Sequence, residues 1–247
     1  MIPWDSALPG LVIDPRRVDI ETYVAIPTTP TRRADFIWAT RTALHRIASK
    51  PIGRDLLGLI SKRCVGIGAQ GPMTCRIMLG EDTVLAQNGI PTPQQYAQGA
   101  VQNTYAAPSL DINDPYKVKE AQTARMFRRS KPIEHLPMWV SGGGFSTFVC
   151  WNPFIDYDLG SVVKLGVPTP GFLALAHELV HALHMLSGDK VKDEDPWQRM
   201  LLEEARTIGC GRFAGARISE NAMRREHGIK ERAFYATPGD CDAANLG

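Results

Sequence analysis

Apolar side chains recur at helical spacing over residues 34–63, in the first third of the chain. The pattern is interrupted at Pro51, a residue that cannot continue a helix because it has no backbone N–H. Two helices joined at "SKPIG" are therefore predicted here.

A second helical pattern lies near the carboxyl end of the chain. It starts at Thr169, a suitable N-cap followed by Pro170, and it ends at Gly188, where a helix stop is expected. Two more helices are predicted behind it, one over residues 195–209 and one beginning at Ser219.

Strand-like runs separate the two helical parts. They are "MTCRIML" at 73–79, "DTVLAQ" at 82–87, "FSTFVCW" at 145–151 and "SVVKLGV" at 161–167. Few strands between groups of helices favour an α+β fold, with a small mixed sheet packed on the helices.

The first 34 residues differ in composition from the rest of the chain. They are rich in proline and threonine, as in "IPTTPTRR", and show little periodicity, which predicts an extended or disordered leader over residues 1–34. The remaining residues, 35–247, are enough for one domain with a sizeable core.

Charge and hydropathy narrow the range of partners. Lysine plus arginine number 28 and aspartate plus glutamate 26, so the balance favours neither a nucleic-acid nor a membrane partner, and a monomer is expected. No run of 18 apolar residues is present, and the first residues lack the basic start of a Sec signal peptide. Five cysteines without CxxC spacing favour reduced thiols.

The string "HELVH" carries the main chemical signal. His177 and His181 are four residues apart, so both imidazoles lie on one face of the helix and can provide half of a tetrahedral zinc site. Glu178, directly after the first histidine, is placed to act as a general base toward the attacking water. Burying these polar groups among so many leucines is costly unless an ion compensates them.

A zinc site of this kind needs a third protein ligand. The metzincin pattern requires a histidine at position 187, where Ser187 stands. The gluzincin pattern takes a glutamate from a following helix, and "LLEEARTIG" provides Glu203 and Glu204. Only one of them can face the metal squarely, and the other either orients a histidine or is a solvated charge. His184 lies roughly 10 Å along the helix from His177, too far to share its ion, and is interpreted as structural.

Two families share these motifs. "HELVHALH" followed by "EEARTIG" resembles the zinc site of clostridial neurotoxin light chains, in which the second glutamate is the ligand; this implies Glu204 here. More of the chain resembles the NleD and HopH type of bacterial type III effector metalloproteases, through "WNP", "HELVHALH", "EEAR" and "SENAMRREHGIKERAFY". The match is good over residues 145–235 and thin elsewhere.

The resemblance implies a zincin-like domain of the gluzincin type. Arg232 and Tyr235 then correspond to the residues that stabilise the transition state, as a guanidinium and a phenol near the metal could. It also implies export by a type III system into the host cytoplasm, and a mitogen-activated protein kinase as substrate.

The predicted function is that of a zinc-dependent endopeptidase that acts on a host protein as a virulence effector. Zn²⁺ is held by His177, His181 and Glu204, and the strand at 145–151 is the expected edge for an extended peptide. The alternative is a catalytically silent zincin-fold module that binds a host protein.

Overall fold

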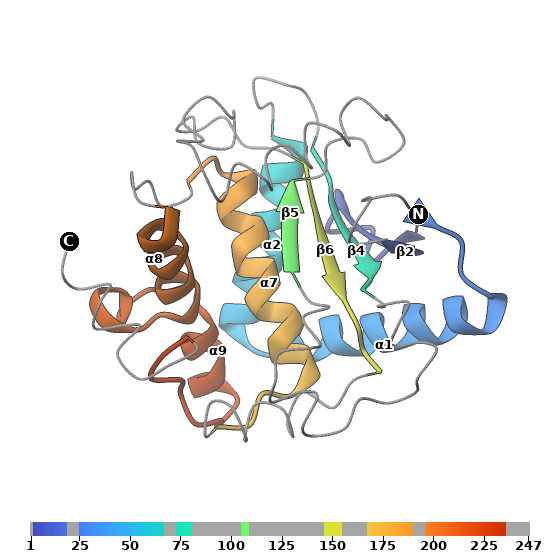
Figure 1. Ribbon diagram of the computed structural model, residues 1–247. Helices are drawn as coiled ribbons and strands as arrows, with labels where there is room; N and C mark the ends of the chain where they lie inside the picture. Colours follow the sequence, from blue (N-terminus) through green and yellow to red (C-terminus); the bar gives the residue numbers. More distant parts are fainter. Residues whose placement is uncertain are drawn as a thin grey trace.

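The computed structural model describes residues 2–18, 25–66, 73–80, 105–108, 146–154, 167–189 and 196–235. These residues form an α+β domain in which helices pack on one face of a mixed sheet (Figure 1). The expected α+β class with a mixed sheet is confirmed. The predicted strands at 82–87 and over 161–166 lie outside the described residues.

The described part of the chain contributes six strands to the sheet: β1 (Ile2–Pro3), β2 (Leu11–Val18), β3 (Ala25–Ile26), β4 (Cys75–Leu79), β5 (Tyr105–Pro108) and β6 (Thr147–Trp151). The order is β1-β2-β4-β6-β5, and β3 also pairs with β2. The three central strands β2, β4 and β6 are parallel, whereas β1, β3 and β5 are antiparallel to their neighbours.

Two helices follow the amino-terminal strands. α1 (Pro30–Ala48) begins at the N-cap Thr29, whose hydroxyl accepts from the backbone N–H of Arg32. α2 (Pro51–Val65) begins with Pro51 in its first turn, where the missing N–H has no cost. The predicted break between the two helices is therefore confirmed.

The main core lies between the sheet and the helices α1, α2 and α7 (Gly171–Leu186). Alternate residues of β2, β4 and β6 face these helices, and they pack with the apolar residues of α7 into one cluster. Thirteen residues of α7 are buried, so this helix lies in the interior of the domain. α7 starts one residue later than predicted, after Pro170, and the predicted stop at Gly188 has a φ of 59°.

α8 (Pro196–Ile208) and α9 (Glu220–Glu226) lie beside α7, as Figure 1 shows. α8 ends at Ile208 and is followed by Gly209, whose φ of 79° few other residues adopt. A Cβ at Gly209 would also lie 2.4 Å from the hydroxyl of Ser219, the N-cap of α9. Gly209 therefore allows the end of α8 to lie against the start of α9, which matters for the site described below.

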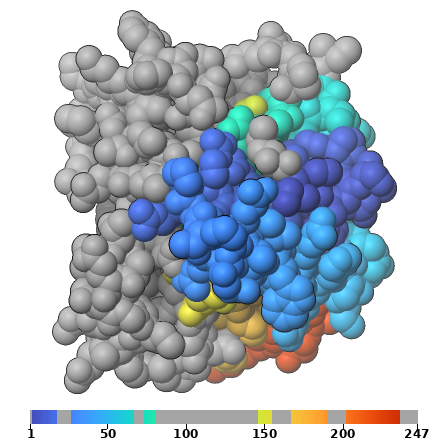
Figure 2. Space-filling view, turned by 90° about the vertical axis from the view of Figure 1, so that its right-hand side faces the viewer, coloured from blue at the N-terminus to red at the C-terminus, as the bar shows by residue number. Residues whose placement is uncertain are grey.

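Two sequence-based expectations are wrong. Residues 2–18 are not a separate leader, because β2 pairs with β4 and buries Leu11 and Ile13 completely. Figure 2 shows these residues beside α1 on one face of the domain. The strand at 145–151 is not an edge, because β6 is paired on both sides.

Two further observations concern hydropathy and cysteine chemistry in the described residues. Within the described ranges, no helix is both long and apolar enough to span a membrane. Cys64, Cys75 and Cys150 are free thiols, whereas Cys210 is disulfide-bonded, so the expectation of reduced thiols is wrong at Cys210.

Candidate metal centre

Two histidines of α7 face α8 from within the core. His177 and His181 are one helical turn apart, their ring centroids are 4.9 Å apart, and both residues are at least nine-tenths buried. Their Nε2 atoms lie 3.2 Å from each other. The spacing read from the sequence therefore does bring both rings to one point.

Glu204 of α8 reaches the same point. Its Oε2 lies 3.2 Å from Nε2 of His177, and its Oε1 lies 3.4 Å from Nε2 of His181. The three side chains form a group whose ligand atoms are close enough to hold a metal ion. The structure thus brings together the three residues that the sequence predicts as ligands.

The opposite nitrogen of each ring faces a second carboxylate. Nδ1 of His177 lies 2.8 Å from Oε2 of Glu220, and Nδ1 of His181 lies 3.3 Å from Oε1 of Glu203. A carboxylate can only accept, so the hydrogens of the neutral rings belong on Nδ1. Both Nε2 atoms then carry lone pairs, and three acceptors converge without a hydrogen between them.

Zinc fits this donor set. A tetrahedral ion with bonds of about 2.0–2.1 Å holds its donors roughly 3.3–3.4 Å apart, close to the separations found here. Three protein ligands leave the fourth coordination position open, as in catalytic zinc sites. Carboxylates on the outer nitrogens of ligand histidines are also typical of such sites.

When no metal ion is bound, the neighbouring charges shift the pKa values of His177 and Glu204. Burial lowers the pKa of His177, but the carboxylates of Glu204 and Glu220 outweigh it and raise that pKa to about 10. Burial likewise raises the pKa of Glu204, but the charge of His181 and the hydrogen bond from His177 outweigh it and hold the pKa well below its usual range. The centre is therefore a place where positive charge is strongly favoured.

Glu220, the first residue of α9, joins this centre to the end of the described chain. Its carboxylate is fully buried and also accepts from Nε of Arg224 at 2.6 Å and from Nη1 of Arg232 at 3.0 Å. Arg224 in turn donates to the backbone oxygen of Pro168 and to the hydroxyl of Thr169, just before α7. One ion-pair network thus connects α9 to both the start of α7 and the His177 ring.

Arg232 lies against this network, held by α9 and the residues after it. Its backbone N–H donates to Oδ1 of Asn221 at 2.8 Å, and its Nη2 donates to the backbone oxygen of Tyr235 at 2.6 Å. The guanidinium is 5.9 Å from the centroid of the Tyr235 ring. The structure therefore places Arg232 against Glu220 and Tyr235 beside Arg232, and their catalytic role stays a prediction.

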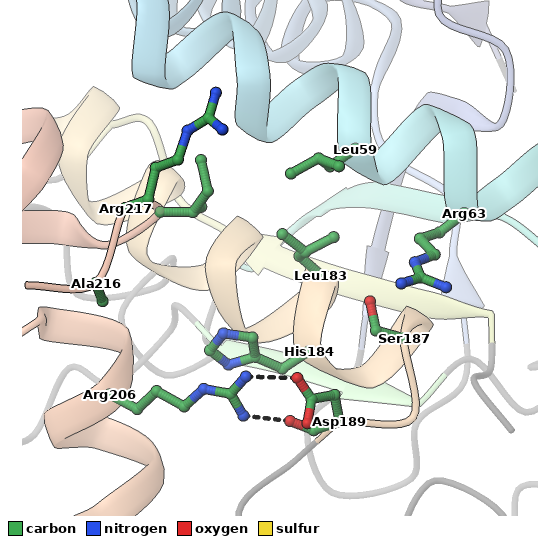
Figure 3. A pocket seen from close by; sticks show the side chains of 10 residues that line it. Leu59, Arg63, Leu183, His184, Ser187, Asp189, Arg206, Ala216 and Arg217 are labelled. Atoms are coloured by element: carbon green, nitrogen blue, oxygen red, sulfur yellow. Dashed lines mark hydrogen bonds and ion pairs between the residues drawn. The ribbon is translucent and has the colours of Figure 1, made fainter. Parts of the chain in front are cut away.

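The other residues of "HELVHALH" occupy different surroundings. Glu178 is half-buried beside His177 on α7. His184 is buried, and its Nδ1 lies 2.7 Å from Oε1 of Glu203. Burial lowers the pKa of His184, which keeps the ring neutral. On its other side His184 lines an open pocket between α2, α7 and α8 (Figure 3).

Sequence reasoning missed the residues that contact the outer nitrogen of His177 or support that contact. Glu220 and Arg224 belong to "SENAMRREHG", a string that the resemblance singles out without giving its charges a role. Their partners lie 43 and 56 positions away, at His177 and Pro168, so no local spacing could indicate them.

Comparison with known proteins gives one family. The peptidase M91 family, described as effector protein, matches residues 26–235, which include every residue of the candidate centre. No curated protein matches the chain.

Proposed function

The chain belongs to the peptidase M91 family of effector proteins, and on this basis we propose that it is a zinc-dependent endopeptidase acting on a host protein. Family membership makes it a protease-type effector, which agrees with the resemblance to NleD-type metalloproteases. The zinc dependence, the residues in their roles and the host substrate are the proposed part.

The observation that carries the proposal is the convergence of three lone-pair donors in a buried place. His177, His181 and Glu204 present nitrogen and oxygen atoms 3.2–3.4 Å apart, an arrangement that is unfavourable unless a proton or a metal ion lies among them. A divalent ion would replace that proton, and these three residues would hold it.

When bound, zinc supplies a Lewis acid that polarises the scissile carbonyl and lowers the pKa of the attacking water. Glu178 accepts the proton of that water and passes it to the leaving amine. Its place on α7, next to His177 and half-buried, gives it access to substrate while keeping it out of the ligand set.

Arg232 and Tyr235 are proposed to steady the negative charge on the attacked carbonyl oxygen. Arg232 is suited to this role because its guanidinium is held in place by Glu220 and by the backbone oxygen of Tyr235. Preorganised donors of this kind need no rearrangement when charge develops.

The proposed setting is a host cell reached through a type III system. A mitogen-activated protein kinase is the substrate that the resemblance implies.

The first prediction concerns Glu178. Glu178→Gln keeps the shape of the side chain but cannot take a proton, so peptide hydrolysis falls by about 100-fold or more while zinc binding is unchanged. Host lysate is incubated with wild-type and variant protein, new amino termini are identified by mass spectrometry, and metal content is measured in parallel.

Asp55→Asn on α2 is the matched control, because it also converts a carboxylate to an amide but lies in a surface ion pair with Arg217. It is expected to cut like the wild type. A Glu178→Gln protein that still produces the wild-type termini would overturn the proposed mechanism. A biological effect that survives this substitution would favour the silent binding module.

A further inference from the structure

Glu203 contacts two histidines with a single oxygen atom. Its Oε1 lies 2.7 Å from Nδ1 of His184 and 3.3 Å from Nδ1 of His181. All three side chains are at least nine-tenths buried. A buried carboxylate that accepts hydrogen bonds from two imidazole N–H groups is a strong acceptor, and the two hydrogen bonds fix its orientation.

The two contacts differ in length, and this gives them different roles. The shorter contact, to His184, anchors the carboxylate, because the Nδ1–H of the buried His184 ring donates to Oε1 of Glu203 at 2.7 Å. The anchored oxygen then faces the His181 ring. Thr207, one turn after Glu203 on α8, lies 3.1 Å from the same Nδ1 of His181.

The same atoms offer a second interpretation, a second metal site. The ligand atoms of His181, His184 and Glu203 all lie within 4.8 Å of one another. An ion there would require His181 to lose its Nδ1 hydrogen while Nε2 holds the first ion, which leaves the ring negatively charged. Two N–H donors on one carboxylate satisfy every group without this cost.

We propose that Glu203 and His184 are positioning residues: His184 holds the Glu203 carboxylate, and Glu203 directs Nε2 of His181 toward the metal position. This inference rests on the proposed zinc site and names the residues that support one of its ligands. His184, which the sequence indicates only as structural, thereby acts on the centre without touching the metal.

The experiment measures zinc affinity by competition with a chelator, with the cobalt-substituted absorption spectrum as a second readout. Glu203→Ala removes the acceptor and His184→Leu removes the anchor, and each is expected to weaken zinc binding by roughly 10–100-fold. Glu203→Gln keeps an oxygen that both rings can use, so its loss is smaller. If Glu203→Ala does not fold, the zinc affinity of Glu203→Gln measures the contribution of the Glu203 carboxylate instead.

Rescue at position 184 separates positioning from packing. The Nδ2 of asparagine stands near the place of Nδ1 of histidine, so His184→Asn restores zinc affinity to within about threefold of wild type. His184 lines the pocket drawn in Figure 3, so the space left by the smaller side chain is expected to open into that pocket. His45→Asn, at an exposed position of α1, is the control.

Three outcomes would overturn the inference. Zinc affinities of Glu203→Ala and His184→Leu within twofold of wild type would show that neither residue positions the ligand. Two zinc ions per wild-type chain, with one lost in His184→Leu, would favour the second metal site. A wild-type protein that binds no zinc would overturn this inference together with the proposed function, whereas the first two outcomes leave the proposed function intact.

Discussion

Glu220 is the residue on which most of the site's charges depend. Its fully buried carboxylate faces His177, Arg224 and Arg232 at once. Charges from the surrounding groups hold its pKa well below the usual range, the largest being that of Arg232, and they outweigh the burial that would raise it. The carboxylate is therefore ionised over the whole physiological range, and its charge is the counterpart of two guanidinium groups, that of the buried Arg224 and that of the partly buried Arg232.

Replacing this carboxylate leaves those cations without a counter-charge. Glu220→Gln is expected to lower the free energy of unfolding by about 3–5 kcal/mol, the usual result of breaking a buried ion pair on one side. Chemical denaturation measures the change.

Glu231→Gln is the matched control, because Glu231 pairs with Arg225 at the surface, where both side chains are nearly half exposed. Its expected effect is about 0–1 kcal/mol. Equal effects of the two substitutions would mean that Glu220 does not neutralise Arg224 and Arg232.

At this scale the sequence indicates the site only in part. His177, Glu178 and His181 follow from spacing alone, because neighbours on one helix need no tertiary information. For the third ligand, spacing leaves Glu203 and Glu204 open. The resemblance points to Glu204, and the geometry agrees, with Glu203 turned to His181 and His184 instead.

Among the elements, the joint between α1 and α2 shows how close approach constrains sequence. A Cβ at Gly53, in the first turn of α2, would lie 1.9 Å from the backbone oxygen of Ile47 near the end of α1. Backbone atoms cannot move aside as a flexible side chain can. The two helices can therefore pack this closely only with glycine at position 53.

Gly53→Ala is accordingly expected to destabilise the protein by at least about 1–3 kcal/mol, as overpacking against a rigid neighbour does. Gly58→Ala, in the same helix, meets no atom within 4 Å and is expected to stabilise the protein by roughly 0.5–1 kcal/mol, because alanine favours the helix. Thermal denaturation of both variants measures the difference. Two shifts of the same sign would contradict the packing described here.

The helices were more predictable from the sequence than the strands, because a helix depends on local contacts and a strand depends on pairing with a distant part of the chain. α1, α2, α7, α8 and α9 each carry a local period or a cap near the predicted position. β2 does not, because "LVIDPRRV" contains Pro15 and has a register irregularity between Asp14 and Arg17. Its stability comes from pairing with β4, about 60 positions later, and from the burial of Leu11 and Ile13.

For the molecule as a whole, the proposed metal centre would connect α7 and α8. Zinc bound there favours the folded state by mass action, about 4 kcal/mol at a free concentration 1,000 times its dissociation constant. We therefore expect zinc to raise the Tm, and we expect its removal to expose the backbone amides of α8 to hydrogen exchange more than those of α1 or α2.

Two variants sharpen this prediction. Glu178→Gln should show the wild-type dependence of Tm on zinc, because Glu178 is not a proposed ligand. Glu204→Gln should lose most of the dependence of Tm on zinc, because Glu204 is a proposed ligand. Equal exchange of α8 with and without zinc would refute the idea that the ion joins the two helices.

The Glu220–His177 contact has a consequence for reading genomes. A premature stop codon after position 218 would leave "HELVH" and both candidate glutamates of α8 unaltered, yet it would delete the carboxylate behind His177 together with Arg232. Such a gene would still register as a metalloprotease by motif while encoding an impaired enzyme. Pseudogenes of this kind are recognised by whether the stretch from 219 to 235 survives, not by the histidines.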